Sequence, residues 1–281
     1  MNNKFFGKAL VAGALLSISF SCSQDDVVSS ADINPITTEV IDQIKSVGFN
    51  PYGVSIFQKT ETLSPEEDQV YLKIEDDILI TMDQLAEMAG SEVHHVGAVQ
   101  EQYRTNNLVS SPRTISVIGY TGGSNALDNT MRTALQWSVN NFNRLNIGLN
   151  FTLSFATSTN ADMVVYRVSG PGGGSAGFPS GGLPNKFIQI QSGTSSFGTN
   201  VTEHVITHEM GHSVGLRHTD YFNRSLSCGT GGNEGDGGVG AILIPGTPSG
   251  FDPNSIMLSC FGDDEDGEFG NFDIVALEFL Y

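Results

Sequence analysis

Three of the six histidines in the chain lie in one short segment, HEMGHSVGLRHTD, at residues 208–220. His208 and His212 are four residues apart, so on a helix their imidazole rings project from the same face, one turn apart. That spacing suits two nitrogen ligands of one tetrahedral zinc ion. Glu209 lies about 100° round the helix axis, so it can reach a metal-bound water without being a ligand. It would accept a proton from the attacking water and pass it to a leaving amine.

Gly215 and His218 complete the pattern. A glycine can adopt the left-handed conformation that ends a helix in a sharp turn, and this turn would bring His218 back to the metal as a third ligand. Three neutral ligands leave the fourth position to water, which is the arrangement of a catalytic zinc site. From residue frequencies, the spacing H-E-x-x-H-x-x-G-x-x-H is expected by chance in roughly one of 10⁵ chains of this length.

The segment that carries the first two ligands reads as a helix. It is predicted to begin near Asn200, because Asn200 and Glu203 have the spacing of a capping box. An apolar stripe can anchor this helix in a core. The stripe consists of Val201, Val205, Ile206, Met210 and Val214.

The residues before this helix predict a sheet and a further helix. Apolar alternation favours strands over residues 113–120, 147–155, 161–168 and 186–193. Residues 127–145 have a helical stripe, formed by Leu127, Met131, Ala134, Leu135, Val139 and Phe142. The glycine-rich residues 169–185 lack the Gly-Lys-Ser/Thr of a phosphate loop, so they are interpreted as the rim of a cleft.

Residues 32–104 are predicted to form a small unit of their own. Apolar spacing indicates a helix that stops at Gly48, a strand or hairpin over residues 68–81, and a short helix over residues 82–90. The unit is interpreted either as a propeptide or as a packing subdomain of the main domain at residues 105–281.

The run from His208 to His218 resembles the zinc signature of the metzincin peptidases. These enzymes have a methionine turn below the metal, and DPNSIM places Met257 there as an apolar floor. The ending NFDIVALEFLY resembles their C-terminal helix. The resemblance covers residues 113–281. With NEG and GAILIPGTP, it narrows to the bacterial dual-action HEIGH metallopeptidases, although Met210 stands where the family name has Ile.

This resemblance implies an α+β, zincin-like catalytic domain after the small N-terminal unit. It would contain a twisted mixed sheet, the active-site helix, the methionine turn and a C-terminal helix. A substrate peptide would lie antiparallel to an edge strand near residues 186–192, where main-chain pairing accepts many sequences.

Several roles around the metal stay open. Some metzincins carry a tyrosine two residues after the turn methionine, and here that position is Ser259. Tyr221 and Arg217 are candidates for the transition-state donor. Asp220 would either accept a hydrogen bond from a ligand histidine or only cap a turn. His204 is interpreted as a helix-terminus residue, because a fourth protein ligand would make the site structural.

The acidic run DDEDGE at residues 263–268 resembles a calcium-binding loop in composition only. It lacks the full D-x-D-x-D-G…E frame. A solvated acidic turn and a Ca²⁺ site both stay open.

The N-terminal residues 1–21 have the basic start and short apolar run of a secretory leader. Their small residues before Cys22 resemble the lipobox of bacterial lipoproteins, which implies a lipid on Cys22 and residues 22–31 as a tether. The expected location is the bacterial outer membrane, with exposure at the cell surface suggested by the acids after Cys22; simple secretion is the alternative. Cys228 and Cys260 then form a disulfide or remain two free thiols.

The N-terminal unit would block the cleft if it is a propeptide. A cysteine ligand for the metal is excluded unless Cys22 serves, and lipidation would occupy that thiol. An aspartate or a steric plug stays open.

The charge balance limits the class of partner. The chain has 13 Lys+Arg against 31 Asp+Glu, a net charge of −18. This argues against nucleic acid and anionic lipid as partners, because both require a cationic surface. The sequence therefore predicts a zinc metalloendopeptidase that hydrolyses extracellular or periplasmic proteins, with Glu209 as general base. One alternative is a non-catalytic, zinc-containing surface binding or adhesion lipoprotein. The other is a secreted structural protein with a closed zinc site, which would need a fourth protein ligand such as His204.

Overall fold

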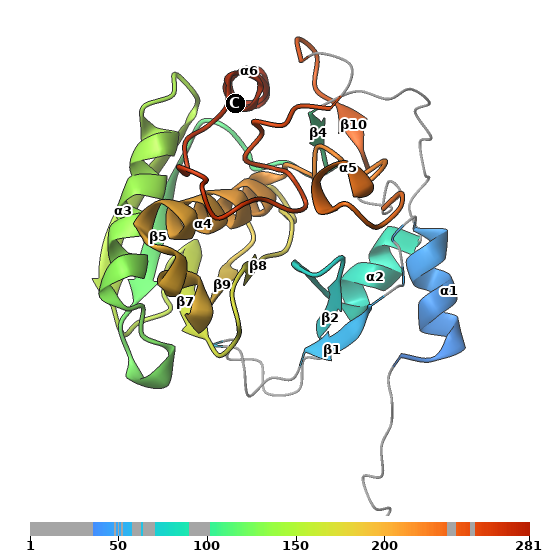
Figure 1. Ribbon diagram of the computed structural model, residues 1–281, viewed down its shortest axis with the longest axis horizontal. Coiled ribbons are helices and arrows are strands. Elements are labelled where there is room, and N and C mark those ends of the chain that lie inside the picture. Colours follow the sequence, from blue (N-terminus) through green and yellow to red (C-terminus); the bar gives the residue numbers. More distant parts are fainter. Residues whose placement is uncertain are drawn as a thin grey trace, which may run out of the picture. The chain divides into compact units, whose positions relative to one another are not determined.

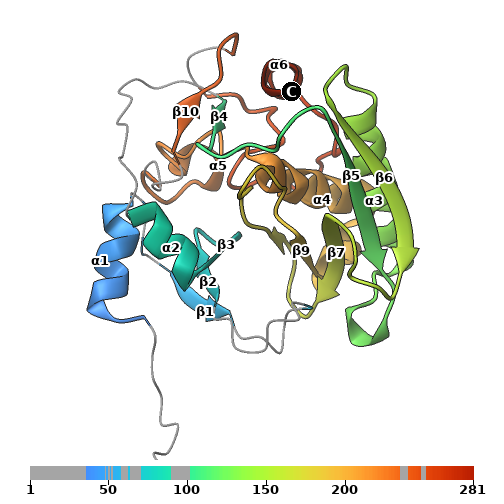
Figure 2. The same ribbon diagram turned by 180° about the vertical axis from the view of Figure 1, so that it is seen from behind.

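The strands predicted after residue 105 form one mixed sheet (Figures 1 and 2). Its order is β6-β5-β7-β9-β8, and all neighbours are parallel except β8, which pairs antiparallel with β9. The strands are β5 (Arg113–Tyr120), β6 (Leu149–Ala156), β7 (Met163–Val168), β8 (Gly174–Ser175) and β9 (Phe187–Gln191). The prediction of an edge at residues 186–192 is wrong, because the glycine-rich segment folds back as β8 and covers β9.

Two long helices pack together beside this sheet, α3 (Asn129–Asn143) and α4 (Thr199–Val214). The side chain of Asp128 caps α3 by accepting from the Met131 amide at 3.0 Å. All residues of both predicted apolar stripes are buried. The capping box predicted for α4 is absent, because the N-cap is Gly198 at φ 94° and no side chain caps the helix.

The chain after α4 is largely irregular and is tied together by a few specific links. A disulfide joins Cys228 and Cys260. Asp273 accepts from the amides of Gly270 and Ile256, both at 2.9 Å, so it connects the C-terminal helix to the residues before Met257. The elements after α4 are α5 (Ser225–Cys228), β10 (Ile242–Leu243), which pairs with β4 (Tyr103–Arg104), and α6 (Asn271–Leu280). Two short 3-10 turns, η2 (Gly123–Asn125) and η3 (Ser192–Phe197), precede α4.

The N-terminal unit contains two helices and a small antiparallel sheet. The predicted hairpin is formed by β2 (Tyr71–Ile74) and β3 (Ile78–Thr81), and β1 (Ser55–Phe57) pairs with β2. The helices are α1 (Thr38–Ser46) and α2 (Met82–Ala89). These elements enclose an apolar core of their own, to which the main domain contributes Phe178.

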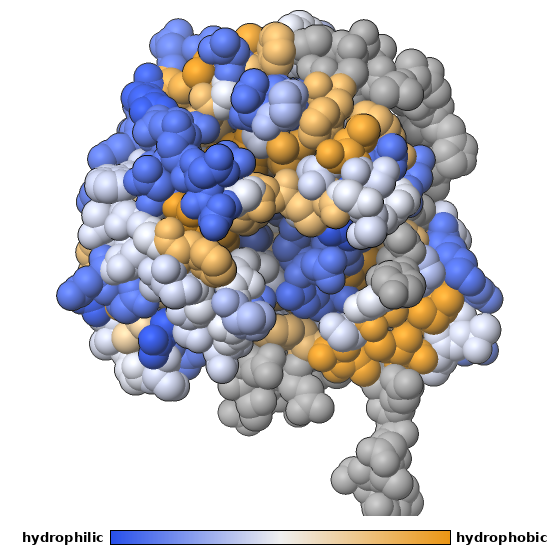
Figure 3. All heavy atoms as spheres, in the orientation of Figure 1, coloured by the Kyte–Doolittle hydropathy of each residue, from blue (hydrophilic) through white to orange (hydrophobic). Residues whose placement is uncertain are grey.

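The computed structural model describes residues 36–47, 49, 51, 53–57, 63, 71–89, 102–234, 240–247 and 251–281. The predicted leader, the tether and Cys22 lie outside these residues. Within them, no helix is both long and apolar enough to cross a bilayer. The α+β class predicted from the sequence is confirmed. In Figure 3, hydrophilic residues lie where Figure 1 places the β2–β3 turn, and this turn reaches the site described next.

Candidate metal centre

Helix α4 carries His208, Glu209 and His212 in the interior of the protein. Every residue from Val201 to Val214 is buried, so the helix is enclosed along nearly its whole length. Polar side chains are costly in such surroundings unless they have partners. The partners of these three residues therefore indicate their function.

Gly215 ends the helix in the left-handed conformation, at φ 113°. Its amide donates to the carbonyl of His212 at 2.9 Å and to that of Gly211 at 3.1 Å. A side chain here would also collide with Leu108, whose Cδ2 lies 2.8 Å from the position of a Cβ. The turn returns the chain beneath the helix and brings His218 to the other two histidines, as the sequence predicts.

The three histidines direct equivalent nitrogens at one point. Nδ1 of His208 lies 2.8 Å from the carbonyl oxygen of Ile256, and Nδ1 of His212 lies 2.9 Å from that of Leu216. Nδ1 of His218 lies 2.9 Å from a carboxylate oxygen of Glu234. Since these oxygens only accept, each Nδ1 carries the proton, and each Nε2 keeps a free lone pair.

Asp77, from the β2–β3 turn, is the fourth group at this point. Its Oδ2 lies 3.0 Å from Nε2 of His218 and 3.5 Å from Nε2 of His208. Nε2 of His212 and Nε2 of His218 are 3.2 Å apart. Burial would raise the pKa of Asp77, but the charge that His218 carries when it is protonated holds this pKa well below its ordinary value.

The donor set fits a zinc ion. Bonds of about 2.05 Å in a tetrahedron place neighbouring ligand atoms about 3.3 Å apart, close to the spacings of 3.0, 3.2 and 3.5 Å found here. Nε2 of His208 is buried and has no hydrogen-bond partner. Converging lone pairs repel one another unless a cation lies between them. The histidine group is therefore consistent with zinc.

Glu209 lies beside this group but is not part of it. Its Oε2 is buried and has no hydrogen-bond partner. Burial raises its pKa well above the ordinary value, and the charge of Asp77 adds to this effect. A Cβ on Gly174 would lie 2.5 Å from Glu209 Oε1, so β8 can approach the carboxylate only because it has glycine there.

Glu234 is the functional residue that the sequence analysis missed. It is fully buried, and besides accepting from His218 it lies 3.0 Å from the Ser259 hydroxyl. It also lies 3.2 Å from Nε of Arg224 and 3.8 Å from a terminal nitrogen of Arg217. Burial alone would raise its pKa, but His218 and the two arginines lower it below the ordinary value.

Asp220, the sequence-based candidate for a histidine acceptor, contacts two serines in the structure. One of its carboxylate oxygens accepts from the amide of Ser259 at 3.0 Å and from the Ser259 hydroxyl at 2.8 Å. The other accepts from Ser227. Asp220 thus fixes Ser259, which in turn contacts Glu234, and the acceptor expected of Asp220 is supplied by a residue 14 positions later.

Met257 lies directly below α4. A Cβ on Gly211 would lie 2.5 Å from Met257 Sδ, so the methionine packs against the bare backbone of the helix. The carbonyl of Met257 accepts from the amide of Thr219 at 2.9 Å. The methionine therefore supports the helix and also the segment that carries the third histidine.

The two candidates for a transition-state donor lie next to each other. The guanidinium of Arg217 is fully buried, 5.7 Å from the ring of Tyr221 and 5.5 Å from that of Phe49. It also faces Glu75 and Glu234, each at 3.8 Å. Arg217 therefore packs against aromatic rings and pairs with carboxylates. The structure assigns the transition-state donor role neither to Arg217 nor to Tyr221.

His204 and the acidic run at residues 263–268 are outside the metal group. The His204 ring packs against Phe261 at 4.2 Å, and burial followed by the charge of His208 lowers its pKa to about 3. Among the described residues, no metal-binding group includes residues 263–268, so Ca²⁺ is unsupported.

Comparisons with known proteins agree with this geometry. A family model described as "Dual-action HEIGH metallo-peptidase" matches residues 72–281, and the chain belongs to this family. It is therefore a metallopeptidase, a hydrolase. The matched span begins at Leu72, so it includes the β2–β3 hairpin.

Two solved structures of myroilysin are similar to this chain. Both are 13% identical in sequence; one has a TM-score of 0.39 and covers 61% of this chain and 81% of its own. The other has a TM-score of 0.37 and covers 66% and 89%. No curated protein matches the chain.

Proposed function

We propose that the chain is a zinc-dependent endopeptidase in which Glu209 is the general base. The observation that supports this most directly is the pairing of two features within one buried site. Three histidine lone pairs converge on one point, and a carboxylate lies beside them with one oxygen free. A site built only to hold a metal has no use for that carboxylate.

The side chains have distinct tasks in this proposal. His208, His212 and His218 would hold zinc, which when bound lowers the pKa of water and polarises a carbonyl. Glu209 accepts the proton of the attacking water and delivers it to the leaving amine. Glu234 fixes the orientation and tautomer of His218, and Met257 supports the helix.

The sheet edge indicates how a substrate would lie. A peptide antiparallel to β8 would have its N-terminal part beside Ala176 and its C-terminal part beside Gly173 and Gly172. Glu209 is opposite Gly174, between these two ends. Residues that follow the scissile bond would therefore extend toward Gly172.

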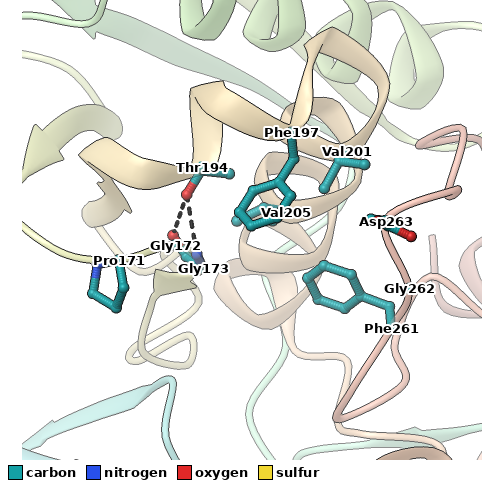
Figure 4. Close-up of a pocket in the computed structure, with 10 residues that line it drawn as sticks. All are labelled: Pro171, Gly172, Gly173, Thr194, Phe197, Val201, Val205, Phe261, Gly262 and Asp263. Atoms are coloured by element: carbon teal, nitrogen blue, oxygen red, sulfur yellow. Dashed lines mark hydrogen bonds between the residues drawn. The ribbon is translucent and has the colours of Figure 1, made fainter.

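An apolar pocket of about 370 Å³ lies at that end (Figure 4). Its walls include Val201 and Val205 of α4, with Phe197 and Phe261 facing them, and Gly172 at the rim. We infer that the pocket takes an apolar side chain just after the scissile bond. Such a pocket discriminates modestly between apolar side chains and more strongly against charged ones.

The location is proposed from the sequence alone. The leader and the small residues before Cys22 support export and a lipid anchor in the outer membrane. Substrates would then be extracellular or periplasmic proteins. Labelling of the protein with a palmitate analogue, and its loss in Cys22→Ala, would test the anchor.

The zinc-peptidase proposal is tested by Glu209→Gln with Glu203→Gln as its matched control. Both changes replace a buried carboxylate by an amide on α4, but Glu203 contacts Asn141, away from the metal group. We expect both variants to bind one zinc. Only Glu209→Gln should lose cleavage of a mixed peptide library, by a factor on the order of 10³ or more.

One observation favours the alternative of a non-catalytic zinc protein. Asp77 supplies a fourth protein ligand, and a closed set of four is typical of structural zinc. If wild type and Glu209→Gln were equally inert toward the library, with the hairpin displaced as described below, the binding lipoprotein would become the better interpretation.

A further inference from the structure

The three histidines face a fourth metal-ligating side chain, which comes from the β2–β3 hairpin. Asp77 Oδ2 lies within 3.0–3.5 Å of two histidine Nε2 atoms, as a ligand of the same ion would. We propose that Asp77 is a metal ligand and that, through it, the β2–β3 hairpin keeps the site closed to water and substrate. The effect of this closure on catalysis rests on the proposed peptidase function, whereas the closure of the metal does not.

The acidic turn is matched by basic groups of the main domain. Asp76, before Asp77, lies 3.4 Å from a terminal nitrogen of Arg224. Glu75 is buried and lies 3.8 Å from Arg217. Three consecutive acids thus meet two guanidiniums and the metal site. This charge complementarity fixes which turn docks and in what orientation.

Two residues of the turn have a left-handed backbone conformation. Glu75 and Asp76 have φ values of 55° and 74°, a left-handed conformation that residues with side chains rarely adopt. They are the two described residues other than glycine with a positive φ. Tight turns between antiparallel strands commonly need residues in this conformation, and this turn presents the Asp77 carboxylate to the histidines.

The hairpin also occupies the edge of the main sheet. The amide of Leu79 donates to the carbonyl of Ala176 at 2.8 Å, and the amide of Ala176 donates to the carbonyl of Asp77 at 2.9 Å. These are main-chain groups that a substrate would need. The bridge between Ile78 and Ala176 is parallel, opposite to the direction inferred for a substrate. The hairpin therefore blocks the cleft with a side-chain carboxylate at the metal.

The hairpin is not part of the apolar core that holds the catalytic helix. Its apolar residues belong to the separate N-terminal core, which includes Leu72, Ile74, Ile78 and Ile80. The main core, around α3, α4 and the large sheet, contains none of them. Release of the N-terminal unit would expose Phe178, which lies 5.5 Å from the His212 ring, but would leave the histidines in place.

The experiment measures whether the metal is open, independently of turnover. The full chain is loaded with Co²⁺, and its visible spectrum is followed while acetohydroxamate, a small chelating anion, is added. We expect no change in wild type and a saturable change in Asp77→Ala. Hydrolysis of the peptide library by the zinc form should rise about tenfold or more in Asp77→Ala, because the fraction of open sites rises.

Asp83→Ala is the matched control. Asp83 is an exposed acid on α2 of the same unit, so the variant loses the same charge away from the site and should behave as wild type. Leu79→Pro is a second route to opening, because it removes the amide that donates to Ala176 and leaves Asp77 intact. It decides the question if Asp77→Ala does not retain cobalt.

Two results would overturn the proposal. One is a wild-type spectrum that responds to acetohydroxamate as strongly as that of Asp77→Ala. The other is a folded, cobalt-loaded Asp77→Ala that stays as closed as wild type. If the spectrum opens but no peptide is cut, closure by Asp77 stands and the peptidase function fails.

Discussion

Glu234 provides a test of the site that depends only on the structure, because its role is inferred from its contact with His218 and not from its sequence context. Its carboxylate accepts the Nδ1–H of His218, at 2.9 Å from one oxygen and 3.1 Å from the other. Glu234→Gln preserves the shape and one acceptor oxygen. It removes the negative charge. With the amide oxygen in the place of Oε1, the contacts of 2.9 Å with His218 and 3.0 Å with Ser259 are kept, but an NH₂ group replaces the oxygen that lies 3.1 Å from Nδ1 of His218.

The expected loss of zinc affinity follows from the geometry. The contact of 2.9 Å, a ring width of about 2.2 Å and a Zn–N bond of about 2.0 Å place the carboxylate about 7 Å from the ion. A single charge and a divalent ion at about 7 Å attract each other by about 1 kcal/mol at the dielectric of water and about 5 kcal/mol at an effective value of 20. Outer-sphere acceptors of this kind change metal affinity by about 10- to 100-fold, or about 1.4–2.7 kcal/mol. The two estimates overlap, so we expect zinc binding to weaken by about 10- to 100-fold.

The assay is competition for zinc against a chelator of known affinity. Asp220→Asn is the matched control, because its carboxylate contacts Ser259 and Ser227 but no histidine. It should weaken zinc binding less than about threefold while lowering the melting temperature. The assignment of Glu234 would be refuted if Glu234→Gln bound zinc as tightly as wild type. It would also be refuted if Asp220→Asn caused the larger loss.

Three further changes test the surroundings of the site. Gly211→Ala should lower stability by about 1–2 kcal/mol in thermal unfolding, since the new Cβ would lie 2.5 Å from Met257 Sδ; an unchanged melting temperature would contradict this packing. Burial raises the pKa of Glu203 to about 7, so the folded state prefers its protonated form and stability falls as pH rises from about 4.5 through 7. Glu203→Gln should remove about 1–2 kcal/mol of this dependence between pH 5 and 8, and equal pH profiles for the two proteins would exclude it. Replacing Cys228 and Cys260 by serine opens a link across 32 positions and should cost about 3.5 kcal/mol in denaturant unfolding; a loss below about 1 kcal/mol would show that other contacts hold this region.

The parts of the site that sequence could predict are those fixed by local geometry. On a helix, a spacing of four residues places His208 and His212 on the same face. A glycine such as Gly215 at the end of a helix usually adopts the left-handed conformation. The strands and α3 were predictable for a similar reason, because each has one buried face with a simple period. Strands β5, β6, β7 and β9 and helix α3 lie where the sequence predicts them.

The errors arose where distant segments decide the outcome. An edge strand is defined by what pairs with it, so β9 could not be recognised as internal until the glycine-rich segment was seen to form β8. The N-cap of α4 is set by where the preceding 3-10 turn η3 ends, and the structure places the cap at Gly198 and not at Asn200. Glu234 lies in a glycine-rich stretch without periodicity, and only the fold brings it to His218.

Asp77 was hidden for another reason. The run IEDDIL has the composition of an ordinary solvated hairpin turn, in which acids at the tip are unremarkable. From the sequence, the N-terminal unit could block the cleft either with an aspartate at the metal or as a steric plug. The structure combines them, since the same turn that supplies the carboxylate also pairs with the sheet edge.

The charges at the docked turn explain why such a closure is stable and why its release prepares the site. Glu75, Asp77 and Glu234 are three carboxylates that face the guanidiniums of Arg217 and Arg224 and the divalent ion that the histidines would bind. Buried charges are tolerated when they are nearly balanced, so the turn stabilises a cluster that would otherwise carry excess positive charge. Departure of the turn removes two of the three carboxylates at once. In the proposed enzyme, a histidine-bound ion with fewer carboxylates around it would better stabilise the negative charge that develops on a peptide carbonyl during hydrolysis.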